Sequence, residues 1–171
     1  EKAGFEVITS DLVRKELAGI APSEHRLEGF RGGIYAADFT ARTYSALLDR
    51  ARPLLLAGRS VVLDASYMRR EHRRPAASLA RETGAQFACL EFDLQDEVIR
   101  KRLVDRLREG GDPSDARPAI LAAQKRRYQR PVEIDAARRI AVPAGGSAEA
   151  KIRAVVKGLR AVSPLSVLAA G

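Results

Sequence analysis

The chain has 171 residues, of which 46% are hydrophobic and 30% charged, which is enough for about one domain with its own hydrophobic core. It contains no long apolar run and no signal-peptide pattern, so we expect neither a membrane span nor secretion. The single cysteine, Cys89, excludes an internal disulfide, which is consistent with a reducing cytoplasm. The formal net charge of +8 favours an anionic partner. However, 24 of the 30 cationic residues are arginine and the chain is rich in alanine, so a GC-rich coding bias can also explain part of this charge.

The first expected element is a short strand that runs directly into a helix. The β-branched pair Val7-Ile8 precedes the polar run Thr9-Ser10-Asp11, and a short helical segment follows. If Ser10 or Asp11 caps the helix, Asp11 and Arg14 lie about one turn apart and project side by side. This pattern is typical of a helix cap with a local ion pair, but it would also present a carboxylate and a guanidinium to a ligand.

A long loop, a helix and a second strand are expected next. Residues 19–33 are rich in glycine and lack periodicity, which indicates a loop long enough to be functional. Residues 37–57 carry apolar side chains at helical spacing, although Pro53 should kink or divide this helix. The apolar run Val61-Val62-Leu63 then ends at Asp64. Such a run is typical of a strand that is covered on both faces, as in a parallel sheet.

The second half of the chain continues this alternation of helices and strands. We expect a basic helix at 69–82, a strand at 86–92, a helix from Asp93 to Gly110-Gly111, a helix reaching about 129, a strand at 139–142 and a helix at 148–159. One domain would span 1–162, followed by a tail at 163–171. The alternation predicts a parallel α/β sheet flanked by helices, in which ligands collect beyond the carboxyl ends of the strands. Asp11 and Asp64 both lie at such ends.

An apolar strand that ends in aspartate, "VVLD", has the form of a Walker B element, in which the carboxylate holds Mg²⁺ directly or through water. Together with "SDLVRKELAG", "GGIYAADFTARTYSALLDRA", "AGRSVVLDASYMRREHR" and "RLVDRLREGGDPSDA", this motif resembles P-loop small-molecule kinases related to gluconate kinase, zeta toxins and polynucleotide 5′-kinases. The likeness is greatest to the kinase module that follows an aminoglycoside-phosphotransferase-like domain in some bacterial two-domain proteins.

The resemblance implies a P-loop NTPase-like fold and an ATP-dependent phosphotransferase that needs Mg²⁺ and phosphorylates a hydroxyl of a small-molecule or nucleotide-like substrate. It implies that Asp11 accepts the proton of the attacking hydroxyl and that Arg14 holds the substrate. Asp64 would hold Mg²⁺, through water. Arg102 and Arg106, one helical turn apart, would act as catalytic lid arginines, with a solvated helix face as the alternative.

The sequence departs from this family because it contains no G-x-x-x-x-G-K-[ST] phosphate loop. The glycines at 29–33 lack the lysine and follow no strand, so we interpret them as a flexible loop. Because "EKAG" at residues 1–4 is typical of the end of a helix, we expect that the central first strand and the phosphate loop are missing from this chain rather than lost from the protein. The chain by itself is then expected to be unstable and inactive.

A non-catalytic module that binds ATP or nucleic acid for regulation is the alternative function, and a structural appendage of a larger kinase-like protein is a third. His25 and His72 have no second ligand at metal spacing, and the absence of tryptophan weakens a nucleic-acid interpretation, which needs aromatic stacking. The expected partners are therefore ATP, a small hydroxyl substrate and an upstream aminoglycoside-phosphotransferase-like domain in the same protein, with neither nucleic acid nor a membrane.

Overall fold

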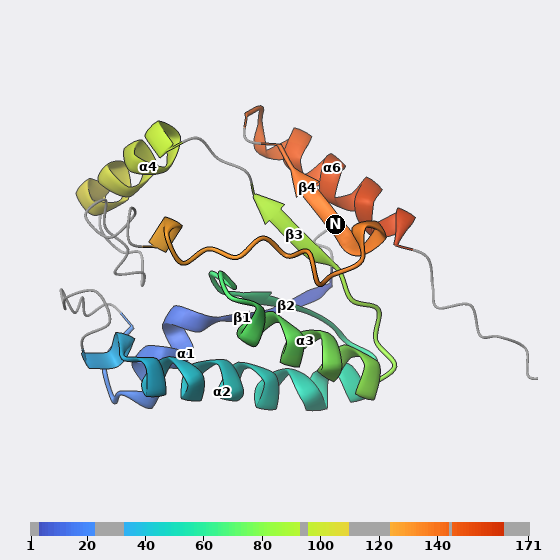
Figure 1. Ribbon diagram of the computed structural model, residues 1–171, viewed down its shortest axis with the longest axis horizontal. Helices are drawn as coiled ribbons and strands as arrows, with labels where there is room; N and C mark the ends of the chain where they lie inside the picture. The colour runs from blue at the N-terminus through green and yellow to red at the C-terminus, as the bar shows by residue number, and fades with distance from the viewer. Residues whose placement is uncertain (1–3, 23–32, 93–95, 110–123, 144, 163–171) are drawn as a thin grey trace, which may run out of the picture.

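The computed structural model describes residues 4–22, 33–92, 96–109, 124–143 and 145–162, and its strands and helices alternate along the chain (Figure 1). The elements are β1 (Phe5–Thr9), α1 (Ser10–Leu17), the 3₁₀ turn η1 (Gly33–Tyr35), α2 (Ala37–Leu56), β2 (Ser60–Asp64), α3 (Arg70–Glu82), β3 (Cys89–Phe92), α4 (Asp96–Glu109), η2 (Ala136–Arg138), β4 (Arg139–Val142) and α6 (Ala148–Ala161). The fold is therefore α/β, with parallel strands flanked by helices and the P-loop NTPase-like arrangement that the sequence predicts.

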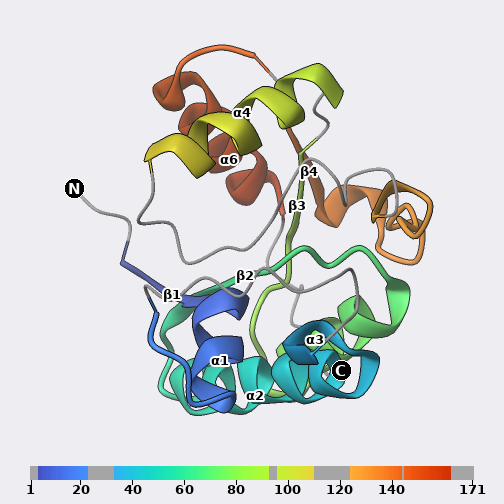
Figure 2. The same ribbon diagram turned by 90° about the vertical axis from the view of Figure 1, so that its left-hand side faces the viewer.

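The strands form two parallel pairs. β1 pairs with β2 from Phe5↔Ser60 to Thr9↔Asp64, and β3 pairs with β4 in parallel over their four residues. Within the described residues these pairs are separate two-stranded sheets, and β2 and β3 are the inner strands of the four (Figures 1 and 2). The inner edges of β2 and β3 thus have no ladder partner in the part of the chain that the structure describes.

Helices cover one face of the β1–β2 pair. α2 packs against both strands and against α1 and α3, and the core that they share centres on Val13, Tyr44 and Leu47. Phe5 and Val7 point to the opposite face, because successive side chains of a strand alternate, and they are 40% and 62% exposed. The expectation that β2 is covered on both faces is not met within the described residues, since residues 61–63 are only half-buried.

Two local predictions are wrong. Helix α1 begins at Ser10 with Thr9 as its N-cap residue, and no side chain caps it, so neither Ser10 nor Asp11 has that role. Helix α2 runs unbroken through Pro53, because this proline lies in the last turn, where its missing N–H removes only one hydrogen bond of a ladder that ends soon after.

Several predicted features lie outside the described residues. These are the helix end at residues 1–3, most of the 19–33 loop, the cap at Asp93, the stop at Gly110-Gly111, most of the helix before residue 129, and the tail at 163–171. Among the helices that the structure does describe, none combines the length and hydropathy needed to span a bilayer.

The contact between α6 and β4 gives a first testable prediction. A Cβ atom at Gly158 would lie 2.5 Å from Cγ2 and 2.9 Å from Cγ1 of Ile140, which is 6% exposed. We expect Gly158→Ala to lower the free energy of unfolding by about 1–2 kcal/mol, because overpacking outweighs the gain of about 1 kcal/mol in helix propensity. Denaturant titration would measure this change, with the exposed neighbour Lys157→Ala as a control that stays within about 0.5 kcal/mol. A stabilised Gly158→Ala variant would contradict the packing.

Candidate functional site

The carboxyl edge of the β1–β2 pair brings the two predicted aspartates to one side of the sheet. The register aligns Thr9 with Asp64, and Asp11 follows Thr9 by two residues in the first turn of α1. Asp64 is exposed and Asp11 is partly exposed. Parallel pairing therefore places both positions where ligands of open α/β sheets bind, beyond the ends of the strands.

Arg14 is turned into the protein. Its side chain is 7% exposed, and its Nη1 donates hydrogen bonds to the Ile34 carbonyl (2.6 Å) and to Thr40 Oγ1 (3.3 Å). The guanidinium lies 4.8 Å from the centre of the Tyr35 ring. Burial lowers the pKa of Arg14, while Tyr35 and then Asp11 raise it. Arg14 thus joins α1 to the start of α2, a role that the sequence did not predict. Among the described residues, its Nε is buried and has no hydrogen-bond partner.

The turn after Asp64 has an unusual backbone. Tyr67 has a φ of 40° and is the only non-glycine residue with positive φ in the described part of the chain. The Tyr67 N–H donates to Tyr44 Oη (3.2 Å), which also lies 3.3 Å from Ser66 Oγ. The Tyr44 ring stacks on His72 at 3.9 Å, and burial raises the pKa of Tyr44 and lowers the pKa of His72. Sequence reasoning missed this use of the Tyr44 hydroxyl.

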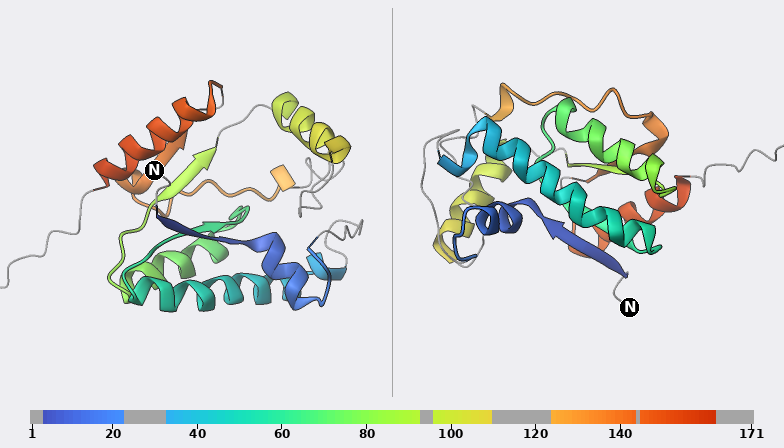
Figure 3. Two further views of the ribbon diagram at one scale, coloured as in Figure 1. Left: turned by 180° about the vertical axis from the view of Figure 1, so that it is seen from behind. Right: turned by 90° about the horizontal axis from the view of Figure 1, so that it is seen from below.

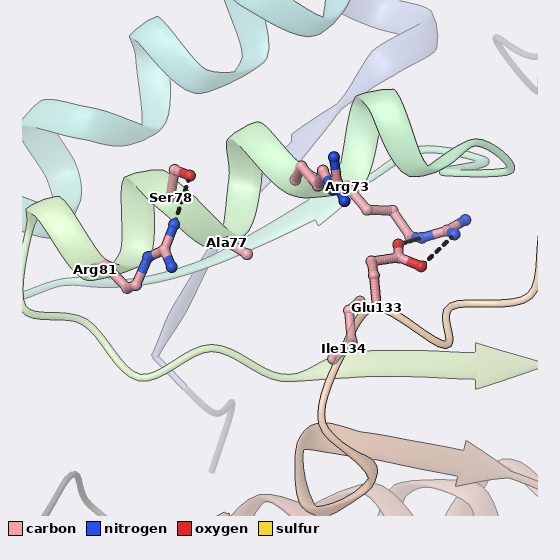
Figure 4. Close-up of a pocket in the computed structure, with 7 residues that line it drawn as sticks. Arg73, Ala77, Ser78, Arg81, Glu133 and Ile134 are labelled. Atoms are coloured by element: carbon pink, nitrogen blue, oxygen red, sulfur yellow. Dashed lines mark hydrogen bonds and ion pairs between the residues drawn. The ribbon is translucent and has the colours of Figure 1, made fainter.

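A buried ion pair lies behind the same turn, at one end of a cavity of about 270 Å³ (Figure 4). Arg73 is 3% exposed and donates to both carboxylate oxygens of Glu133, at 2.6 Å and 3.1 Å. It also donates to the carbonyls of Tyr67 (2.8 Å) and Arg130 (3.3 Å). The hydrogen bonds from Arg73 lower the pKa of Glu133 and keep it ionised. The sequence showed only a basic helix here, because the partner acid lies 60 residues away.

The predicted lid arginines belong to α4. Arg102 is exposed, whereas the side chain of Arg106 lies outside the described portion of the structure. α4 lies on the same side of the molecule as α1 and the carboxyl end of β1 (Figures 1 and 3). The catalytic role of both arginines stays a prediction.

The donor atoms at this edge fit a magnesium ion better than a transition metal. Among the described residues, no group of three or more His, Cys, Asp or Glu side chains could hold a metal. Mg²⁺ needs no such cage, because proteins usually bind it through one or two carboxylates while water and phosphate oxygens complete the shell. Asp64, with Asp11 at the same edge, is a donor set of this kind, whereas no phosphate loop is present in the sequence to hold a nucleotide.

Comparison with known proteins decides the family. Residues 1–131 match a family described as an AAA domain. The chain belongs to this AAA domain family. The AAA domain family is P-loop NTPase-like and includes kinases, so the match supports nucleotide binding. The predicted P-loop superfamily is thereby confirmed at this coarser level.

Curated relatives are also found. The chain is 29% identical over 139 residues to the uncharacterized protein Mb2027c of Mycobacterium bovis and, equally, to the uncharacterized protein Rv2004c of Mycobacterium tuberculosis. Each match covers 80% of this chain but only 28% of the relative, so the chain corresponds to less than a third of those proteins. No solved structure matches the chain significantly.

Proposed function

We propose that the protein is an ATP-dependent phosphotransferase that phosphorylates a hydroxyl of a small-molecule or nucleotide-like substrate. The proposal rests on one observation: in an AAA domain chain, two carboxylates follow neighbouring parallel strands at the edge where ligands bind. Phosphoryl transfer needs charge neutralisation and positioning more than covalent help from the protein, and carboxylates at this edge can supply both a metal ligand and a base.

The residues have separate roles in this proposal. Asp64 holds Mg²⁺, which neutralises charge on the transferring phosphate when bound. Asp11 accepts the proton of the acceptor hydroxyl. Arg14, expected from the sequence to hold the substrate, is buried against Ile34 and Thr40, so it positions the start of α2 beside Asp11 instead. Arg102 and Arg106 add positive charge from α4.

We also propose that a strand and phosphate loop from outside these 171 residues lie between β2 and β3. The unpaired inner edges of both strands and the exposed Phe5 and Val7 support this proposal. We therefore expect the 171-residue chain alone to melt without cooperativity. A chain extended upstream by about 30 residues, which is the length of one strand, one loop and one helix, should melt in one sharp transition. Calorimetry of both chains distinguishes these outcomes, and a sharp two-state melt of the short chain would reject the added strand.

The metal role of Asp64 gives the direct test of the proposed function. In the full-length protein, Asp64→Ala should abolish magnesium-dependent nucleotide turnover, because it removes the carboxylate that holds the ion. Asp49→Ala, at an exposed aspartate of α2, is the matched control and should turn over nucleotide as the wild type does. Full turnover by Asp64→Ala would reject the proposed role.

The alternative is a non-catalytic module that binds ATP or nucleic acid for regulation, and the net charge of +8 favours it. It predicts that ATP or a polyanion binds the full-length protein without turnover.

We propose that an aminoglycoside-phosphotransferase-like domain accompanies this chain, since the relatives are more than three times as long as the matched segment.

A further inference from the structure

The turn after Asp64 is held from two sides by elements that do not belong to it. On one side, the buried Tyr44 of α2 accepts the Tyr67 N–H at 3.2 Å and pairs with the Ser66 hydroxyl at 3.3 Å. On the other side, Arg73 of α3 donates to the Tyr67 carbonyl at 2.8 Å. Both backbone polar groups of Tyr67 are therefore satisfied by side chains, at the residue whose φ of 40° a non-glycine residue rarely adopts.

Arg73 is itself fixed by a distant segment. Its remaining donors meet the Glu133 carboxylate, whose side chain is only 10% exposed, and the Arg130 carbonyl. Gln129 adds two bonds from the same segment, since its N–H donates to the Met68 carbonyl and its Oε1 accepts the Arg70 N–H, both at 2.9 Å. The 129–133 segment thus holds both the turn and the start of α3.

We propose that Tyr44 and the Arg73–Glu133 pair are positioning residues that set the direction of the Asp64 carboxylate through the strained turn at Tyr67. This inference rests on the proposed function for its catalytic consequence, but the clamp itself can be tested without turnover. A residue in an unfavourable backbone conformation persists only where its surroundings over-determine it, and such residues cluster at functional sites. Here the contacts that Tyr44 and Arg73 make to the turn itself fall on Ser66 and Tyr67, within three residues of Asp64.

Tyr44→Phe in the full-length protein is the sharpest test, because it removes the hydroxyl but keeps the ring that stacks on His72 and meets the edge of Tyr67. The matched control is Tyr128→Phe, which removes a hydroxyl bonded to Glu91 at 3.0 Å on the surface. Loss of the hydrogen bond should accelerate hydrogen exchange at the Tyr67 amide about three- to tenfold, and the control should leave it unchanged. Equal exchange in wild type and Tyr44→Phe would overturn the clamp.

The catalytic consequence is read from the magnesium dependence of turnover. Tyr44→Phe should raise the Mg²⁺ concentration for half-maximal turnover about three- to tenfold, leave KM for the acceptor unchanged and leave the melting temperature close to that of Tyr128→Phe. Faster exchange at Tyr67 with an unaltered magnesium dependence would overturn the positioning role. If the wild type shows no turnover at all, the proposed function fails, and the exchange measurement alone decides whether the clamp exists.

Discussion

Replacing Asp11 by asparagine in the full-length protein should lower the rate of phosphoryl transfer by about 10²–10⁴-fold, because the amide cannot accept the proton of the acceptor hydroxyl. The substitution keeps the size of the side chain in the first turn of α1, so the fold should be retained. The loss should appear in kcat, with the KM values of nucleotide and acceptor changed little, because a base acts mainly in the transition state. Steady-state kinetics with saturating Mg²⁺ would measure it.

The control for this prediction lies on the same helix. Glu16→Gln removes an acidic charge from α1 at an exposed position, where Glu16 pairs with Arg50 at 2.8 Å. Exposed ion pairs of this kind contribute little to stability, so this variant should stay folded and keep the wild-type kcat. If Asp11→Asn and Glu16→Gln both keep the wild-type rate, Asp11 is not the base.

Replacing Arg73 by methionine should lower the free energy of unfolding by about 2–3 kcal/mol, because the Glu133 carboxylate loses its two short hydrogen bonds and keeps only the longer ion pair with Arg70 (3.6 Å). The carbonyl of Tyr67 loses its donor in the same step, so the turn after Asp64 should loosen as well. Denaturant titration of the full-length protein would report the first effect, and hydrogen exchange near Tyr67 would report the second.

Two further variants separate burial from charge. Arg52→Met breaks the exposed pair with Glu82 (2.7 Å) and should change stability by less than about 1 kcal/mol. The double variant Arg73→Met with Glu133→Leu should recover much of the lost stability, because an apolar pair replaces a carboxylate that has lost its main partner. An Arg73→Met variant as stable as Arg52→Met would contradict the burial of this ion pair.

The sequence by itself determined the order of the elements, the parallel α/β class and the position of both aspartates at the ends of strands. These features depend on local signals: the apolar run before Asp64 specifies a strand, and the helical spacing over residues 37–57 specifies α2 within one residue at its carboxyl end. Family membership was predictable for the same reason, since the motifs that carry it lie within short continuous stretches.

Only the tertiary structure decided which charged and polar groups meet. Arg14 donates a hydrogen bond to a carbonyl 20 residues away, and Arg73 donates to a carboxylate 60 residues away. The periodicity of α2 placed Tyr44 in the core but could not show that its hydroxyl meets the turn at Tyr67. Such partners depend on how helices and loops pack around the strands, and a buried polar group must bond to whichever group that packing brings near, whatever their separation in the sequence.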